Sequence, residues 1–372
     1  MAAAMDSETD RQYMRMALRL AERGLGYVAP NPAVGCLIVQ DGAIVGRGWT
    51  QAGGRPHAEA MALEQAGEKA KGATAFVTLE PCAHQGKTPP CAEALVASGI
   101  ARVVTALEDP DKRVEGKGHQ ILRDAGIDVT EGLRASEAAF LNAGFILTKT
   151  QSRPLVTLKM ATSLDGRIAT ATGDSQWITG RLSRRYGHML RAQNDAIMVG
   201  IGTVMSDDPE LTCRIPGLGG RSPIRIVADT RLRLPLTSKL VMTAKDVPLW
   251  ILTIPGNERE RLLAYKDLGV KVIEVAADET GLPDMRKGLK QFAKLGITRI
   301  LAEGGSHLLA TLIKDELADR LMWFRANRII GGDGIPALQS IGLRQLDDAP
   351  EIRLIEERRL GEDLLESYFL RN

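Results

Sequence analysis

The sequence predicts an α/β fold with two domains, on the evidence of its length, its alternating pattern and one polar break. A chain of 372 residues exceeds the size, about 250 to 300 residues, at which single hydrophobic cores stop growing. Segments with the apolar spacing of helices and strands alternate along it, which is typical of sheets covered by helices. The polar stretch Thr148–Arg153, followed by Pro154, interrupts this alternation. We therefore expect domains at residues 6–150 and 151–372, with residues 1–5 outside both.

The first domain is expected to open with an amphipathic helix from Asp10 to Gly24, which a glycine ends. A β-hairpin follows, with strands Val34–Val39 and Ala43–Trp49 joined by the turn dipeptide Asp41-Gly42. Repeated αβ units complete this domain: His57–Ala66 (helix), Ala73–Leu79 (strand), Cys91–Ser98 (helix), Arg102–Leu107 (strand), Gly118–Ala125 (helix) and Ile127–Thr130 (strand). Such an order places a site where strands end and helices begin.

The second domain repeats the alternation with a different order of elements. We expect strands at Leu155–Met160, Ala196–Val199, Ile224–Ala228, Leu249–Thr253, Lys271–Val275, Arg299–Ala302, Arg320–Phe324, Glu351–Glu356 and Leu364–Phe369, and helices at Leu182–Gln193, Met285–Leu295 and Ser306–Lys314. No G-x-G-x-x-G motif opens a helix after the first strand, which disfavours a classical Rossmann domain. The turn Glu303-Gly304-Gly305-Ser306 instead joins a strand to a helix, where backbone N–H groups can meet a phosphate.

Composition and charge limit the partners that this chain can have. Its 48 basic and 46 acidic residues are mixed along the sequence, and the net charge of +2 gives no general attraction for nucleic acid or an anionic membrane. No apolar run approaches the roughly 18 residues of a membrane span, and no secretory signal is visible. We expect a cytoplasmic protein with a small-molecule substrate, without nucleic-acid or membrane partners. Of its four cysteines, Cys36 and Cys213 are expected to lie in the core or to have an incidental role.

Three residues have the types and the spacing of a catalytic zinc site. His57 belongs to an H-x-E motif, and Cys82 and Cys91 lie about 25 and 34 residues further along. One imidazole and two thiolates are suitable zinc ligands, and three protein ligands leave a fourth position for a water molecule, whose pKa the metal lowers. Glu59 stands two residues after His57, close enough to transfer protons without binding the metal. This pattern predicts a zinc-dependent deaminase that acts on an amino-bearing heterocycle.

The segment between the two cysteines narrows the substrate. Zinc deaminases commonly have two residues there, whereas this chain has eight, from Ala83 to Pro90. This segment resembles the P-C-x-H-x-G-x-T-P-P-C loop of the bifunctional riboflavin biosynthesis enzymes. In them a diaminohydroxyphosphoribosylaminopyrimidine deaminase is fused to a 5-amino-6-(5-phosphoribosylamino)uracil reductase. The motifs Asn31-Pro32-Ala33-Val34-Gly35 and Thr78-Leu79-Glu80-Pro81-Cys82 share the resemblance, which continues through the second domain.

The resemblance implies a cytidine-deaminase-like domain followed by a domain similar to dihydrofolate reductase. Its cofactors would be one Zn²⁺ per deaminase site and NADPH. In the first site, the residues expected at the substrate are Asn31, His84, Lys87, Thr88 and Asp109. Asn31 can pair with a heterocycle edge and Lys87 with a phosphate, although Asn31 and Asp109 are equally suited to shaping turns.

The resemblance also assigns residues in the second domain, near the motifs Ser163-Leu164-Asp165-Gly166-Arg167 and Gly173-Asp174-Ser175-Gln176-Trp177. The implied NADPH contacts are Ala161, Trp177, Thr203, Asp207, Gly305, Ser306 and the helix up to Thr311. The implied substrate contacts are Ser175, Arg191, Leu211, Arg214 and Glu303. Without the family context, a solvated helix face for Arg191 and a loop charge for Arg214 are the commoner roles. No role follows for His307.

Two functions of other classes compete with the bifunctional enzyme. A nucleic-acid-editing deaminase with a C-terminal binding module should show a basic stripe with interleaved aromatic residues. Only 4% of the residues of this chain are aromatic, and its charges are balanced. A zinc-stabilised scaffold should have a fourth protein ligand, and none accompanies the three named here. A homodimer is expected through the family alone.

Overall fold

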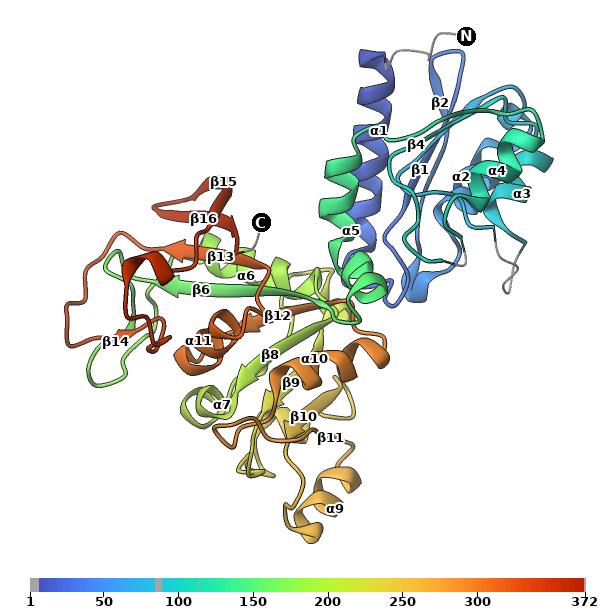
Figure 1. Cartoon of the computed structure of the whole chain (residues 1–372). Coiled ribbons are helices and arrows are strands. Elements are labelled where there is room, and N and C mark those ends of the chain that lie inside the picture. The colour runs from blue at the N-terminus through green and yellow to red at the C-terminus, as the bar shows by residue number, and fades with distance from the viewer. Residues whose placement is uncertain (1–6, 84–88, 113, 371–372) are drawn as a thin grey trace. The chain divides into compact units, whose positions relative to one another are not determined.

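The computed structural model of the chain describes residues 7–83, 89–112 and 114–370. It divides into two compact units, Met1–Ser152 and Arg153–Asn372, which we call the first and the second unit. Each has its own sheet and its own hydrophobic core (Figure 1). In the described parts, no helix has both the length and the apolar character needed to cross a membrane.

The first unit is a three-layer α/β sandwich. Its five-stranded sheet has the order β2-β1-β3-β4-β5, in which β1 is antiparallel to β2 and β3, and the last three strands are parallel. The strands are β1 (Gly35–Gln40), β2 (Ala43–Trp49), β3 (Thr74–Val77), β4 (Arg102–Thr105) and β5 (Asp128–Thr130). The helices are α1 (Glu8–Ala21), α2 (Ala58–Ala66), α3 (Cys91–Ala97), α4 (Lys117–Asp124) and α5 (Ala135–Thr150).

Alternate side chains of strand β1, which lies between β2 and β3, point to opposite faces of this sheet, as the pleat requires. Cys36 and Ile38 pack with α2, α3 and α4. Leu37 and Val39 pack with α1 and with Ala138 of α5. Figure 1 shows α1 and α5 together on one face and α2, α3 and α4 on the other. The expected core position of Cys36 is confirmed, since it has no exposed surface.

The second unit has a nine-stranded sheet with the order β11-β10-β9-β8-β12-β6-β13-β16-β15. Its strands are β6 (Leu155–Thr162), β8 (Ala196–Gly200), β9 (Ile224–Ala228), β10 (Leu249–Thr253), β11 (Lys271–Glu274), β12 (Arg299–Glu303), β13 (Arg320–Arg325), β15 (Arg353–Leu360) and β16 (Asp363–Phe369). Among its described strands, the pairs β13–β16 and β16–β15 are antiparallel and the other pairs are parallel. The short strands β7 (Arg167–Ala169) and β14 (Ile335–Pro336) form a separate ribbon.

Helices cover this sheet and enclose two main hydrophobic clusters. They are α6 (Arg181–Ala192), α7 (Ile201–Asp207), α8 (Lys239–Met242), α9 (Arg259–Asp267), α10 (Met285–Lys294) and α11 (Ser306–Lys314). The expected strand at Glu351–Glu356 is displaced, because the residues that pair with β16 begin at Arg353. Cys213 is buried, as expected.

Candidate functional site

His57, Cys82 and Cys91 form a cluster of metal-ligand type in the first unit. His57 directly precedes α2, Cys91 is the first residue of α3, and Cys82 lies in the segment after β3. Their ligand atoms all lie within 4.8 Å of one another, and His57 Nδ1 is 3.3 Å from Cys91 Sγ and 3.6 Å from Cys82 Sγ. Tetrahedral zinc with ordinary bond lengths separates such atoms by roughly 3.5 Å. The donor set and its spacing therefore fit Zn²⁺ with three protein ligands.

Close backbone contacts bring these ligands together. A Cβ atom at Gly48 of β2 would lie 1.9 Å from the carbonyl oxygen of Ala58, so glycine lets the start of α2 approach the sheet. The Cys91 N–H points at Cys82 Sγ at 3.3 Å, and the Ala92 N–H donates to the Cys82 carbonyl at 3.2 Å. The segment that carries Cys82 is thereby held against the N-terminus of α3, which begins at Cys91.

The two thiols have opposite protonation preferences. The hydrogen bond from Cys91 lowers the pKa of Cys82 to about 4 and raises the pKa of Cys91 itself. The same thiolate raises the pKa of His57 through its hydrogen bond. A site that already holds negative charge on sulfur is suited to a divalent cation.

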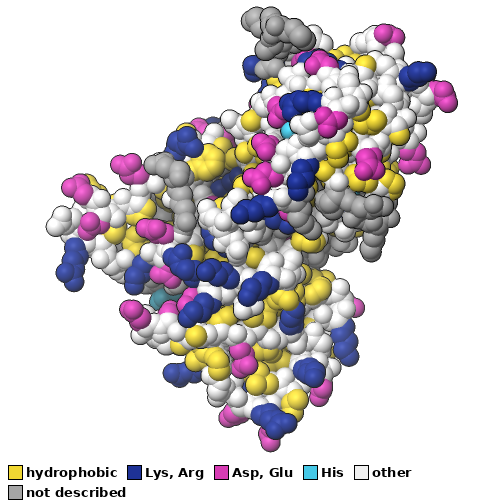
Figure 2. Space-filling model, turned by 45° about the vertical axis from the view of Figure 1, so that its right-hand side comes forward, with side chains coloured by type: hydrophobic (Ala, Val, Ile, Leu, Met, Phe, Trp, Pro, Cys, Tyr) yellow, Lys and Arg dark blue, Asp and Glu magenta, His cyan; other side chains and the backbone are white. Residues whose placement is uncertain are grey.

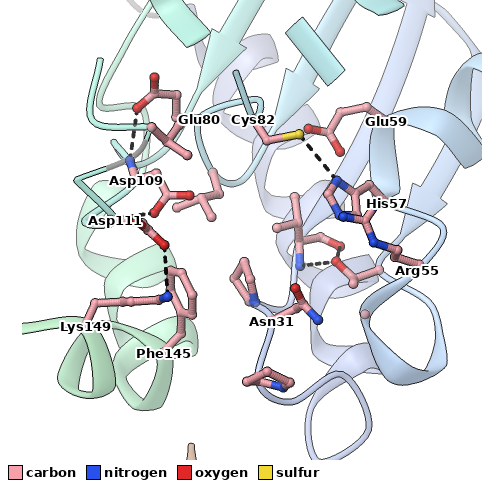
Figure 3. A pocket seen from close by; sticks show the side chains of 17 residues that line it. Asn31, Arg55, His57, Glu59, Glu80, Cys82, Asp109, Asp111, Phe145 and Lys149 are labelled. Atoms are coloured by element: carbon pink, nitrogen blue, oxygen red, sulfur yellow. Dashed lines mark hydrogen bonds and ion pairs between the residues drawn. The ribbon is translucent and has the colours of Figure 1, made fainter. Parts of the chain in front are cut away.

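Glu59 lies in the first turn of α2 and lines the same pocket as His57 and Cys82 (Figure 3). Only 4% of its surface is exposed. Burial raises the pKa of Glu59 to about 7, and the negative charge of Cys82 acts in the same direction. A carboxyl group with this pKa can accept and release protons near neutral pH.

Asn31 and Asp109 line this pocket as well, on segments other than α2 and α3. Burial raises the pKa of Asp109 to about 6, and its carboxylate accepts the Asp111 N–H at 2.9 Å. Asp111 forms an ion pair with Lys149 of α5 at 2.9 Å. Figure 3 shows Asp109, Asp111 and Lys149 on the wall opposite His57.

Glu80 also lines the pocket, although its sequence pattern predicts no role for it. Its buried carboxylate accepts N–H groups from Asp109 at 3.2 Å, Gly116 at 3.0 Å and Gly118 at 2.8 Å. Glu80 therefore holds the segment that carries Asp109. The only sequence signal for it is its place in the motif Thr78–Cys82.

Three residues expected at the substrate, His84, Lys87 and Thr88, lie outside the described residues. Their proposed contacts rest on the loop motif alone.

The expected phosphate turn in the second unit joins β12 to α11. Gly304 and Gly305 have φ values of 66° and 77°, a conformation that favours glycine. Thr203 of α7 lies against both, since its Oγ1 would be 3.3 and 3.2 Å from Cβ atoms placed there. No side chain in the described parts caps α11, so its first N–H groups can receive an anion. The residues present thus fit the pyrophosphate of a dinucleotide.

Arg191 and Glu303, both expected at the substrate, are bound to each other. Arg191 Nε and Nη2 donate to the two Glu303 carboxylate oxygens at 2.9 and 2.8 Å. Lys159, for which the sequence predicts no role, stands directly opposite Glu303 in the pairing of β6 with β12. Burial lowers the pKa of Lys159. These residues form a charge cluster, Lys159–Arg191–Glu303, at the carboxyl end of β12.

The other residues expected in the second unit are more dispersed. Trp177 is exposed beneath the Arg184 guanidinium, whose carbon is 4.6 Å from the ring centroid. Arg214 is exposed and paired with Glu210 at 3.0 Å. Among the described residues, neither makes a hydrogen bond or ion pair with the charge cluster. The remaining positions are Ser175 (partly exposed), Leu211 (buried), Asp207 (exposed, last residue of α7), Ala161 (on β6), Ser306 (accepting from Gln339) and His307 (exposed).

Two family models together match most of the chain. Residues 7–107 match the cytidine and deoxycytidylate deaminase zinc-binding region. Residues 154–365 match the RibD C-terminal domain. The first of these includes all three residues of the metal cluster, and the second includes the Lys159–Arg191–Glu303 cluster.

Full-length relatives agree with both models. The chain is 43% identical to riboflavin biosynthesis protein RibD of Aquifex aeolicus, covering 97% of this chain and 98% of the relative. It is 42% identical to RibD of Escherichia coli, covering 95% and 98%. The structure of Acinetobacter baumannii RibD superposes with a TM-score of 0.87 at 37% identity, covering 97% and 99%. The structure of the Thermotoga maritima deaminase/reductase superposes with a TM-score of 0.85 at 33% identity, covering 97% of this chain and 98% of that one. The chain therefore belongs to the RibD family of riboflavin biosynthesis proteins, with a deaminase domain followed by a dihydrofolate-reductase-like domain.

Proposed function

We propose that this bifunctional zinc- and NADPH-dependent enzyme carries out two consecutive steps. The first unit hydrolyses 2,5-diamino-6-(5-phosphoribosylamino)pyrimidin-4(3H)-one to 5-amino-6-(5-phosphoribosylamino)uracil and ammonia. The second reduces the ribosyl side chain of that product to ribityl. The observation that carries the proposal is the placement of buried Glu59 in one pocket with the ligands His57 and Cys82, beside Cys91.

In the first unit, the metal would be held by His57, Cys82 and Cys91. Zinc bound there supplies Lewis acidity, which makes water a nucleophile near neutral pH. Glu59 takes a proton from the attacking water and passes one to the departing amino group, which leaves as ammonia. Its pKa of about 7 suits both transfers. The Asn31 amide and the Asp109 carboxyl orient the ring, and His84, Lys87 and Thr88 border the substrate, with Lys87 toward its phosphate.

In the second unit, NADPH supplies the hydride that C1 of the opened ribose, or its imine, receives. Gly305, Ser306 and the start of α11 hold the cofactor phosphates, with Thr203 packed beneath the turn. Ala161, Trp177 and Asp207 complete the cofactor contacts. Arg191 holds the Glu303 carboxylate so that it faces the substrate hydroxyls. Burial lowers the pKa of Lys159, so its Nζ can release a proton to the substrate. Ser175, Leu211 and Arg214 contribute the remaining substrate contacts, Arg214 to the phosphate.

A single assay tests both halves of this proposal. The protein is supplied with the diaminopyrimidine substrate and NADPH, while ammonia and the nicotinamide absorbance are followed together. We expect one ammonia released and one NADPH consumed per substrate, with ammonia appearing first. Ammonia without loss of NADPH would limit the proposal to the first unit, and the absence of ammonia would contradict it.

We further infer that the protein is a cytoplasmic homodimer without nucleic-acid or membrane partners. Basic and acidic side chains are interspersed on the face of the first unit that Figure 2 shows, which gives no support to a nucleic-acid groove there. Light scattering would test the dimer, and a gel shift with tRNA and single-stranded DNA at near-physiological salt would test the partners. Tight binding of either nucleic acid would revive the editing alternative.

A further inference from the structure

Gly54 lies directly against the side chain of Asn31 at the edge of the pocket. A Cβ atom at Gly54 would be 1.9 Å from Asn31 Nδ2, 2.4 Å from Cγ and 2.8 Å from Cβ. These three are the nearest atoms to that position, and all belong to the Asn31 side chain. Both residues line the same pocket as His57 and Glu59. No side chain at position 54 fits unless the Asn31 amide moves.

The backbone around Asn31 is held from other directions, so it cannot easily retreat. The Asn31 N–H donates to the Val28 carbonyl at 3.0 Å. Two residues further on, both backbone groups of Ala33 bond to the Asn142 side chain of α5, at 2.9 and 3.0 Å. An atom added at Gly54 would therefore displace the amide more readily than the backbone.

The Asn31 amide is also available for a ligand. Within the described parts of the chain, the backbone N–H makes the only hydrogen bond of Asn31, and its side chain makes none. Figure 3 shows the amide between the wall that carries His57 and the wall that carries Asp109. An amide offers one acceptor and two donors, which suits the edge of an aminopyrimidinone.

We propose that Gly54 is a positioning residue for the deamination, acting through Asn31. Because position 54 has no side chain, the Asn31 amide can lie where it pairs with the substrate ring. This inference rests on the proposed deaminase function of the pocket. It predicts that the requirement for glycine at position 54 disappears when the Asn31 side chain is removed.

The test compares Gly54→Ala with the matched control Gly53→Ala. Gly53 and Gly54 have φ values of 68° and 85°, so alanine is strained at both positions. A Cβ atom at Gly53, however, meets nothing within 4 Å. We expect kcat/KM for ammonia release to fall at least about tenfold further in Gly54→Ala than in Gly53→Ala, because only Gly54→Ala should remove the polar contact between Asn31 and the substrate. Zinc content should stay at one per chain in both.

The double variant Asn31→Gly/Gly54→Ala separates this role from a general structural one. In the Asn31→Gly background, Gly54→Ala should change kcat/KM no more than Gly53→Ala changes the wild type. Equal effects of Gly54→Ala in both backgrounds, or equal activity of the two single alanine variants, would overturn the inference. If Gly54→Ala does not fold, recovery of folding in the double variant supports the contact, and failure of both contradicts it. Wild-type protein that releases no ammonia would instead refute the proposed function, while the melting temperatures of these variants would still test the contact.

Discussion

The Arg191 guanidinium holds the Glu303 carboxylate through two parallel hydrogen bonds, of 2.9 and 2.8 Å. Burial alone would raise the pKa of Glu303, but the charge of Arg191 and its hydrogen bonds lower it to about 2. Because the fork of Arg191 is occupied by Glu303, we propose that Arg191 acts on the substrate through the carboxylate that it orients, and that the exposed Arg214 meets the substrate phosphate.

We expect Arg191→Met to destabilise the second unit by about 3 kcal/mol, because it leaves a buried carboxylate without its partner. Replacing both residues, as Arg191→Met/Glu303→Leu, should restore part of that stability, since neither charge of the pair then remains buried, while the buried Lys159 loses the neighbouring carboxylate. Differential scanning calorimetry of the full chain measures both variants. A double variant that is no more stable than Arg191→Met would show that the ion pair does not account for the loss.

The pH dependence of the first unit should change on replacing Asp109 with Asn. The folded pKa of Asp109, about 6, lies above the value of about 3.9 in an unfolded chain. Its contribution to stability is therefore full below about pH 4 and is lost as the pH rises through 6. The negative charges of Asp111 and Glu80 also raise the pKa of Asp109, whereas the positive charge of Lys149 lowers it.

Asp109→Asn should accordingly gain stability relative to wild type as the pH rises from about 4 to about 6, by up to about 3 kcal/mol before solvent screening, and the gain should stay constant above about pH 7. Asparagine has the same shape and can still accept the Asp111 N–H. Melting temperatures of both proteins across this range provide the measurement. A constant difference at all pH values would mean that Asp109 does not titrate in this range.

Removal of one metal ligand should affect the two activities differently. In Cys91→Ser, we expect zinc to fall well below one per chain and ammonia release to be lost, since serine is a poor zinc ligand. NADPH oxidation with the deaminated compound should stay near the wild-type rate, because its residues belong to the second unit. Metal analysis and the two assays check this. Full zinc occupancy in Cys91→Ser would remove Cys91 from the ligand set.

Much of the fold can be read from the sequence where one physical signal dominates. Strands β9 and β10 and helix α11 have the predicted bounds, since buried parallel strands are continuous apolar runs and the double glycine marks where α11 begins. Helix α5 is not predicted, because its buried face includes Asn142, which serves the Ala33 backbone. Helix α7 is not predicted either, because it follows β8 without a loop and no connecting segment marks where the strand ends and the helix begins.

In the candidate sites too, residues with a local sequence signal can be predicted, and residues that meet only through the fold cannot. His57, Glu59, Cys82 and Cys91 can be recognised because their residue types and spacing are tied to zinc chemistry. The pairing of Arg191 with Glu303 joins residues 112 positions apart, and no local pattern contains it. Lys159 is likewise an ordinary strand residue until its partner strand is known.

We propose that one chain carries two separate activities and that Glu59 serves only the first. Glu59→Gln keeps the size of the side chain and removes its ability to transfer protons. This variant should be assayed with the diaminopyrimidine for ammonia, and with the deaminated compound for NADPH oxidation, after its folding and zinc content are verified. We expect no measurable ammonia and a near-normal rate of NADPH oxidation. Retained ammonia release, or loss of both activities in the folded, zinc-loaded variant, would contradict it.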